Sequence, residues 1–179
     1  MESLGELLAV SERRALEFFA TGLKDVCESD VDREELVYNA SVLAHYALVS
    51  TESTSGWPAP TTLAAVFDQF VQEAEALAAA SVMEEAGAQC LLMTGFFETQ
   101  MRGRHNIRWY ASLGAAFYAR AAEASPSPRR ARFLGALARE FEPWRRRHAR
   151  LSRDLRDIPY LLRLPHPPIV DVTAAAKKE

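Results

Sequence analysis

Apolar residues recur along this chain at spacings of three and four, which is the period of an α-helix. No segment alternates convincingly between apolar and polar residues with the period of two that a β-strand shows. The pattern predicts a first helix from about Ser11 to Cys27, with a short amphipathic turn before it, and a second helix over about 33–50. Asp32 and Glu35 have the spacing of a capping box at the start of the second helix.

Three more helices are predicted in the middle of the chain. A segment rich in Ser, Thr and Pro over 51–62 is predicted to be a loop, and a one-sided apolar stripe over 63–78 predicts the third helix. The fourth helix is expected to end at about Gln100, and the fifth covers about 106–124. The polar segment 102–106 is expected to form the turn between them.

The C-terminal helical segment has the most regular pattern, because its apolar residues alternate spacings of three and four. This heptad pattern is typical of a helix that packs along a continuous seam, which could close within one chain or across a homodimer. Pro143 lies inside the seam and lacks a backbone N–H, so we expect the helix to kink or restart there. The seam residues are Leu134, Leu137, Phe141, Trp144, His148, Leu151, Leu155 and Ile158.

Together these elements predict an all-α fold, a single helical bundle of five to seven helices over residues 1–158 with a kinked, heptad-patterned C-terminal helix. The fifth helix and the heptad helix are expected at its centre. Residues 159–179 contain several prolines and no helical period, which predicts an extended, partly disordered tail. We expect this tail to dock Leu161, Leu162 and Ile169 on the surface of the bundle.

The composition adds a soluble, non-membrane expectation to this picture. Hydrophobic residues make up 49% and charged residues 25%, the ordinary balance of a globular protein. No apolar run approaches the roughly 18 residues that a spanning helix needs, and the N-terminus lacks the pattern of a secretory signal. Cys27 and Cys90 lie in apolar surroundings, so we expect reduced, packed thiols and a cytoplasmic location.

Charge is distributed unevenly along the chain. Residues 1–124 carry 8 Lys/Arg and 18 Asp/Glu, a net charge of −10, whereas residues 125–165 carry 11 Arg and 4 acids, a net charge of +7. The basic helix could therefore bind nucleic acid, or it could lie against the acidic body of the same protein. Phe141 and Trp144 fall on the apolar seam, which favours their burial over stacking on bases.

No motif for a metal, a nucleotide or a catalytic nucleophile is present. None of the four histidines follows a glutamate at the Glu-x-x-His spacing, and neither Cys-x-x-Cys nor a glycine-rich phosphate loop occurs. We therefore expect no metal and no cofactor. His45 and His148 lie on apolar helical faces, where a core or boundary position is favoured. Protonation of His148 would place a charge in the seam, which suggests pH-sensitive packing.

Gly95 and Gly114 each lie near the middle of a predicted helix, where glycine costs about 1 kcal/mol relative to alanine. Such glycines let another backbone or a ligand approach closely, and a packed helix crossing is the favoured interpretation. The alternative is a ligand pocket or active site in which Glu98 is the acid/base and Arg102 and Tyr110 orient the substrate. Its candidate residues are Glu98, Arg102, Tyr110, Gly114 and Tyr118.

The segments "AQCLLMTGFFE" (88–98) and "IRWYASLGAAFY" (107–118) carry a family resemblance. A Leu-rich helix that ends in Gly-aromatic-aromatic precedes a helix with a Tyr…Gly…Tyr pattern. In this respect residues 84–120 resemble a group of uncharacterised bacterial all-helical proteins. The resemblance implies an all-helical bacterial protein and carries no activity.

Three functions are compatible with the sequence. The leading hypothesis is a non-catalytic cytoplasmic binding or regulatory protein that acts through protein–protein contacts. The alternatives are a ligand-binding protein or enzyme with its site at the Gly95/Gly114 crossing, and a nucleic-acid-binding protein that uses the basic C-terminal helix. The candidate partner surface consists of Trp57, Arg145, Arg146, Arg150 and Arg153.

Overall fold

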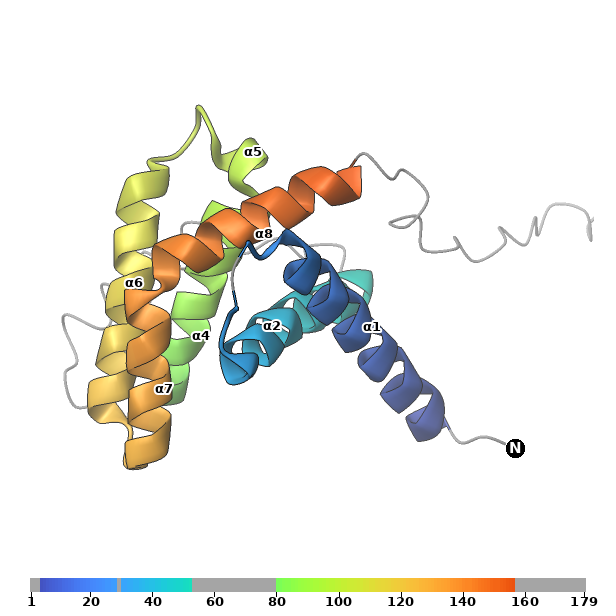
Figure 1. The fold of residues 1–179 in the computed structure, drawn as a ribbon, viewed down its shortest axis with the longest axis horizontal. Helices are drawn as coiled ribbons and strands as arrows, with labels where there is room; N and C mark the ends of the chain where they lie inside the picture. Colours follow the sequence, from blue (N-terminus) through green and yellow to red (C-terminus); the bar gives the residue numbers. More distant parts are fainter. Residues whose placement is uncertain (1–3, 29, 53–79, 157–179) are drawn as a thin grey trace, which may run out of the picture.

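The computed structural model describes residues 4–28, 30–52 and 80–156, and in these ranges the protein is a bundle of α-helices without a β-strand (Figure 1). The all-α prediction is thus confirmed. The elements are α1 (Leu4–Val26), α2 (Arg33–Glu52), α4 (Ala80–Leu91), a π-helical turn η2 (Leu92–Phe96), α5 (Glu98–Met101), α6 (Ile107–Ala124), α7 (Pro128–Arg139) and α8 (Phe141–Arg156). The predicted helix over 63–78, Trp57 and the tail lie outside the described residues.

Helices α4, α6 and α7 pack side by side, and α1 packs on α2 (Figure 1). Helix α8 crosses between these two groups and contacts η2, α1 and α6. This central position follows from its heptad seam, whose described residues are all buried from Leu134 to Leu155. A stripe that is apolar over several turns needs a partner along its whole length.

The seam is interrupted before Pro143 rather than at it. Helix α7 ends at Arg139, Glu140 adopts a non-helical conformation, and α8 restarts at Phe141, so Pro143 lies in the first turn of the new helix. A proline in a helix interior would clash with the carbonyl four residues earlier, which is that of Arg139. In a first turn no intrahelical partner for its nitrogen is required. The predicted restart is therefore present, but three residues upstream of the expected position.

The start of the first helix was predicted too late. Helix α1 is continuous from Leu4 to Val26, and Ser11 lies inside it rather than capping it. The apolar positions before and after Ser11 keep the same helical phase, and no proline interrupts them. A serine costs little in a helix interior compared with the continued stripe.

The predicted fourth helix, ending at about Gln100, is divided into three pieces. The π-helical turn η2 follows α4, Phe97 leaves helical geometry, and α5 is a single turn. A π-turn inserts an extra residue and so rotates everything after it around the helix axis. As a result Thr99, which a regular helix would place on the same side as Gly95, is exposed, whereas Met101 is buried.

Polar side chains fix the helix N-termini. The Asp32 carboxylate accepts hydrogen bonds from the backbone N–H groups of Glu34 and Glu35 at 2.8 and 3.1 Å, which confirms Asp32 as a cap. Asn106 caps α6 in the same way. The Glu35 carboxylate, expected to complete a capping box, instead accepts a hydrogen bond from Trp144 Nε1 at 2.7 Å. This contact ties α2 to α8.

Candidate functional site

Gly95 and Gly114, the two glycines of the predicted crossing, lie where helices pack closely against one another. A Cβ at Gly114 would lie 2.5 Å from Phe141 Cζ and 2.6 Å from Cys90 Cβ. A Cβ at Gly95 would lie 2.8 Å from the Cβ of His148 and 3.0 Å from the Arg145 carbonyl oxygen. The space beside Gly114 is thus occupied by side chains from α8 and α4. This geometry favours the packed crossing over a pocket floored by these glycines.

The candidate pocket residues divide into two groups with different neighbours. Tyr118 is buried against Gly87, and its hydroxyl lies 3.3 Å from that of Tyr38 on α2. Burial raises the pKa of Tyr118 well above its usual value. Glu98 of α5 pairs with Arg102, the residue after this helix, at 2.8 Å, and Glu98 also lies 3.5 Å from Arg153 of α8.

Cys90 lies in the wall of this crossing, where it contributes to packing. Its side chain is fully buried beside Gly114. Burial raises the pKa of the Cys90 thiol to about 12, because the charged thiolate would be desolvated. Very little thiolate is then present at neutral pH, which makes Cys90 a poor nucleophile.

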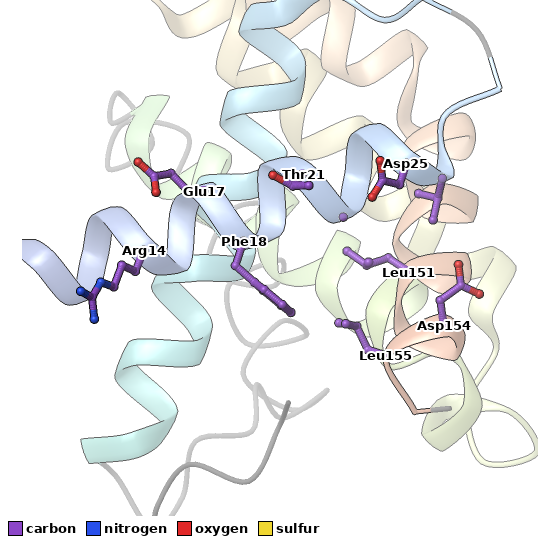
Figure 2. A pocket seen from close by; sticks show the side chains of 10 residues that line it. Arg14, Glu17, Phe18, Thr21, Asp25, Leu151, Asp154 and Leu155 are labelled. Carbon is purple, nitrogen blue, oxygen red and sulfur yellow. The ribbon is translucent and has the colours of Figure 1, made fainter. Parts of the chain in front are cut away.

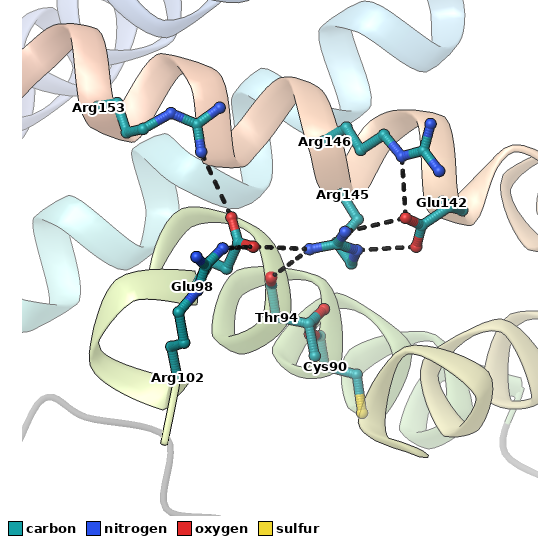
Figure 3. Close-up of polar contacts among 8 residues, drawn as sticks. All are labelled: Cys90, Thr94, Glu98, Arg102, Glu142, Arg145, Arg146 and Arg153. Atoms are coloured by element: carbon teal, nitrogen blue, oxygen red, sulfur yellow. Dashed lines mark hydrogen bonds and ion pairs between the residues drawn. The ribbon is translucent and has the colours of Figure 1, made fainter. Parts of the chain in front are cut away.

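Arg145 is the centre of an ion-pair network that joins α8 to η2 and α5 (Figure 3). Its guanidinium donates to both carboxylate oxygens of Glu142, at 2.8 and 2.9 Å, and to the Thr94 carbonyl at 3.1 Å. It also lies 3.7 Å from the Glu98 carboxylate. Hydrogen bonds from Arg145 lower the pKa of Glu142. The network fixes the π-turn against α8, where Gly95 allows the close approach.

We predict that Arg145→Met lowers the free energy of unfolding by about 2 kcal/mol, because hydrogen bonds to charged groups are lost at a partly buried site. The Arg145 side chain is 13% exposed, whereas that of Arg146, which pairs with the same Glu142, is 74% exposed. Arg146→Met is the matched control and should cost less than about 0.5 kcal/mol. Urea unfolding of both variants measures the difference, and equal losses would contradict the assigned role of Arg145.

The four arginines of the predicted partner surface all pair with carboxylates of the protein itself. Besides Arg145 and Arg146, Arg150 lies 2.7 Å from Glu28 and Arg153 lies 3.5 Å from Glu98. The basic helix therefore lies against acidic residues of the body, one of the two arrangements that its charge allowed. Trp57, the fifth residue of that surface, lies outside the described residues.

His148 is fully buried and connects α8 to α2. Its Nε2 lies 3.0 Å from Asn39 Oδ1, while Asn39 Nδ2 donates to the Glu35 carbonyl. Because Oδ1 is an acceptor, Nε2 carries the proton, and Nδ1 has no hydrogen-bond partner among the described residues. Burial lowers the pKa of His148 to about 3. The imidazole is therefore neutral in the folded protein at physiological pH.

A groove of about 520 Å³ lies between α1 and the C-terminal half of α8 (Figure 2). Its apolar wall includes Phe18, which is 37% exposed, together with Leu151 and Leu155. Gly22 lies in close contact with Leu151, since a Cβ there would lie 2.8 Å from Leu151 Cδ1. The α1/α8 groove is lined by Arg14, Glu17, Phe18, Thr21, Gly22, Asp25, Val26, Leu151, Asp154 and Leu155.

The rim of the α1/α8 groove is acidic. It carries the carboxylates of Glu17, Asp25 and Asp154 and the single guanidinium of Arg14. Among the ion pairs formed within the described residues, none includes any of these three carboxylates. Within the described residues these carboxylates therefore differ from four arginines of α8, Arg145, Arg146, Arg150 and Arg153, which all form ion pairs.

A second groove, of about 410 Å³, lies between α2 and α4. Its lining includes His45, which is exposed, so the predicted core or boundary position of this histidine is wrong. Glu84 on the same groove is already paired with Arg130 of α7, and Tyr38 with Tyr118. These contacts leave the α2/α4 groove with fewer uncommitted charged groups than the α1/α8 groove.

Sequence reasoning missed the α1/α8 groove, although one signal for it exists. Phe18 is an apolar residue beside the buried stripe of α1 that contains Phe19, Leu23 and Val26.

Comparison with protein families, curated proteins and solved structures finds no match to this chain. In the described ranges no three His, Cys, Asp or Glu side chains come together as potential metal ligands, and every helix is too short or too polar to cross a bilayer.

Proposed function

We propose that this is a non-catalytic binding protein whose α1/α8 groove takes a segment of a partner protein that combines apolar and basic side chains. The observation that supports this proposal is the combination of an apolar floor, in which Phe18 is 37% exposed, with rim carboxylates that form no ion pair within the described residues. Ligand sites in proteins commonly pair an apolar surface with a few polar groups that fix orientation. Here the polar groups are acidic, so they select a basic partner.

The apolar floor supplies affinity. Phe18, which is 37% exposed, presents part of its aromatic ring in the groove that Leu151 and Leu155 also line. Burial of a fully exposed side chain of this size is worth roughly 1.5–3 kcal/mol, so covering the remaining third of Phe18 is worth roughly 0.5–1 kcal/mol. Aromatic residues at the centre of an interface often carry much of its binding energy. A partner with a leucine or aromatic side chain over Phe18 would bury this surface.

The carboxylates supply selectivity and speed. Three carboxylates against one guanidinium give the rim a net negative charge. Such a field accelerates the association of a cationic segment and disfavours an anionic one. It also makes binding weaker at higher ionic strength, because the rim groups are exposed to solvent.

The two alternative functions gain no specific contact from the structure. Four arginines of the basic C-terminal helix, Arg145, Arg146, Arg150 and Arg153, are paired with Glu28, Glu98 and Glu142. The proposed acid/base Glu98 is engaged by Arg102, Arg145 and Arg153, away from Tyr118. Both alternatives stay predictions, and the α1/α8 groove offers the better-supported site.

The proposal is tested by selecting a random peptide library against the full-length protein. We expect the enriched peptides to combine Leu or aromatic residues with Lys or Arg, and to lose at least about tenfold in affinity on Phe18→Asp, a loss near 1.4 kcal/mol. The matched control is Trp109→Asp, because Trp109 is 47% exposed on α6 and is not part of the groove lining.

Both variants are first checked for unchanged helicity by circular dichroism. Peptides that bind the wild type and the Phe18→Asp variant with equal affinity would overturn the proposal. Enrichment of acidic peptides would do so as well, since the rim of the groove would repel them.

A further inference from the structure

The α1/α8 groove lies where the chain leaves the described part of the structure. Leu151 and Leu155 of α8 form one wall of the groove, and α8 ends at Arg156, directly after Leu155 (Figures 1 and 2). The segment that follows Arg156 therefore begins at the edge of this groove.

The sequence that follows has the chemistry that the groove selects. Residues 158–164 read "IPYLLRL", in which Pro159 cannot continue a helix and favours extended backbone at the preceding residue. In an extended chain alternate residues share a face, which would place Ile158, Tyr160, Leu162 and Leu164 together. Arg163 adds a positive charge to match the acidic rim.

The dimensions also agree. Seven extended residues span at most about 25 Å. The groove-lining part of α1, from Arg14 to Val26, is about 18 Å long at 1.5 Å per residue. The segment 158–164 is therefore long enough to run along the groove once the chain has turned after α8.

We propose that residues 158–164 of the same chain occupy the α1/α8 groove and act there as an internal competitor of the partner. Docking of residues 158–164 in the groove is inferred from the groove and the segment alone. Competition with a partner also rests on the proposed function. A directly linked segment has an effective concentration in the millimolar range, so even weak docking is populated. If the segment is docked in about nine of ten molecules, the apparent affinity for a partner falls about tenfold.

Photo-crosslinking of the full-length protein tests the occupancy. Benzoylphenylalanine in place of Leu162 is expected to crosslink within one chain to the α1 peptide 14–26. Phe18→Asp should abolish that crosslink, and the control Trp109→Asp should leave it unchanged. Crosslinks that map to the α2/α4 groove, that join two chains, or that fail to form would each overturn the proposal.

A second measurement separates this inference from the proposed function. Leu162→Asp in the full-length protein should tighten the binding of a library-selected peptide about tenfold, whereas Ala175→Asp, beyond the apolar segment, should not change it. Unchanged binding by Leu162→Asp, with Phe18 still required, would refute the internal competitor and leave the proposed function standing. Crosslinks to α1 without any peptide binding would refute the proposed function and leave the docking standing.

Discussion

Gly114→Val is expected to lower the free energy of unfolding by about 3 kcal/mol. The first added carbon would lie 2.5 Å from the Phe141 ring and 2.6 Å from Cys90 Cβ, closer than carbon atoms approach in proteins. The Phe141 ring cannot simply swing away, because it is buried beside Tyr118. Overpacking of this kind typically costs about 1–3 kcal/mol, and β-branching in a helix adds a few tenths.

The matched control for this substitution is Gly135→Ala on α7. A Cβ at Gly135 meets only the end of the Arg139 side chain, at 3.5 Å, so the helix-forming preference of alanine should dominate. We expect Gly135→Ala to stabilise the protein by about 0.5–1 kcal/mol. Urea unfolding gives both values, and a Gly114→Val variant as stable as the wild type would show that this crossing is not tightly packed.

Stability is expected to fall as the pH drops below about 6.5, with His148 as a principal cause. The imidazole has a pKa of about 3 in the folded protein and an ordinary value of 6.5 when unfolded. Between these values the unfolded chain binds a proton that the folded protein does not, so acid favours unfolding. Each unit by which the pH falls in this window lowers the free energy of unfolding by about 1.4 kcal/mol, which amounts to a loss of roughly 2 kcal/mol at pH 5. Above pH 6.5 this contribution is fully present and constant.

The variant His148→Gln isolates this effect from the titration of carboxylates. Glutamine cannot be protonated in this range and can still donate to Asn39, so the variant should lose less stability between pH 7 and pH 5 than the wild type. The measurement is the difference between the two urea midpoints at each pH. Parallel profiles for the two proteins would rule out His148 as the source of the pH dependence.

Several features of the fold follow directly from the sequence. The heptad seam predicted that α7 and α8 share one buried stripe, and the residues from Leu134 to Leu155 confirm it. The same pattern placed His148 in the interior. The two mid-helix glycines were attributed to a close crossing, and both lie against α8. In each case the prediction used the helical period of the apolar residues, which indicates the side of a helix that is buried.

Other features depend on tertiary contacts that a single sequence does not reveal. The π-turn at Leu92–Phe96 is stabilised where Gly95 meets α8 and Arg145 reaches the Thr94 carbonyl, two contacts between distant parts of the chain. The same holds for Glu35, whose expected role as a cap was replaced by a bond to Trp144. Local patterns identify which groups can bond, and the packing of the helices decides which ones do.

The candidate site was the hardest part to predict, for a related reason. The arginines of α8 suggested a partner surface, but Arg150 pairs with Glu28, which follows α1, and Arg153 pairs with Glu98 of α5. The α1/α8 groove, in turn, exists only because α1 crosses α8 at Gly22 and leaves Phe18 exposed beyond the crossing. Neither these long-range ion pairs nor the groove can be predicted without knowing how the helices are arranged.

Hydrogen exchange would show whether the α1/α8 groove is the binding surface of this protein. Mass spectrometry would compare the full-length protein with and without a library-selected apolar-basic peptide. We predict slower exchange confined to α1 from Arg14 to Val26 and to α8 from Leu151 to Leu155. Protection of the α2/α4 groove instead, or of α6 and α7, would contradict it.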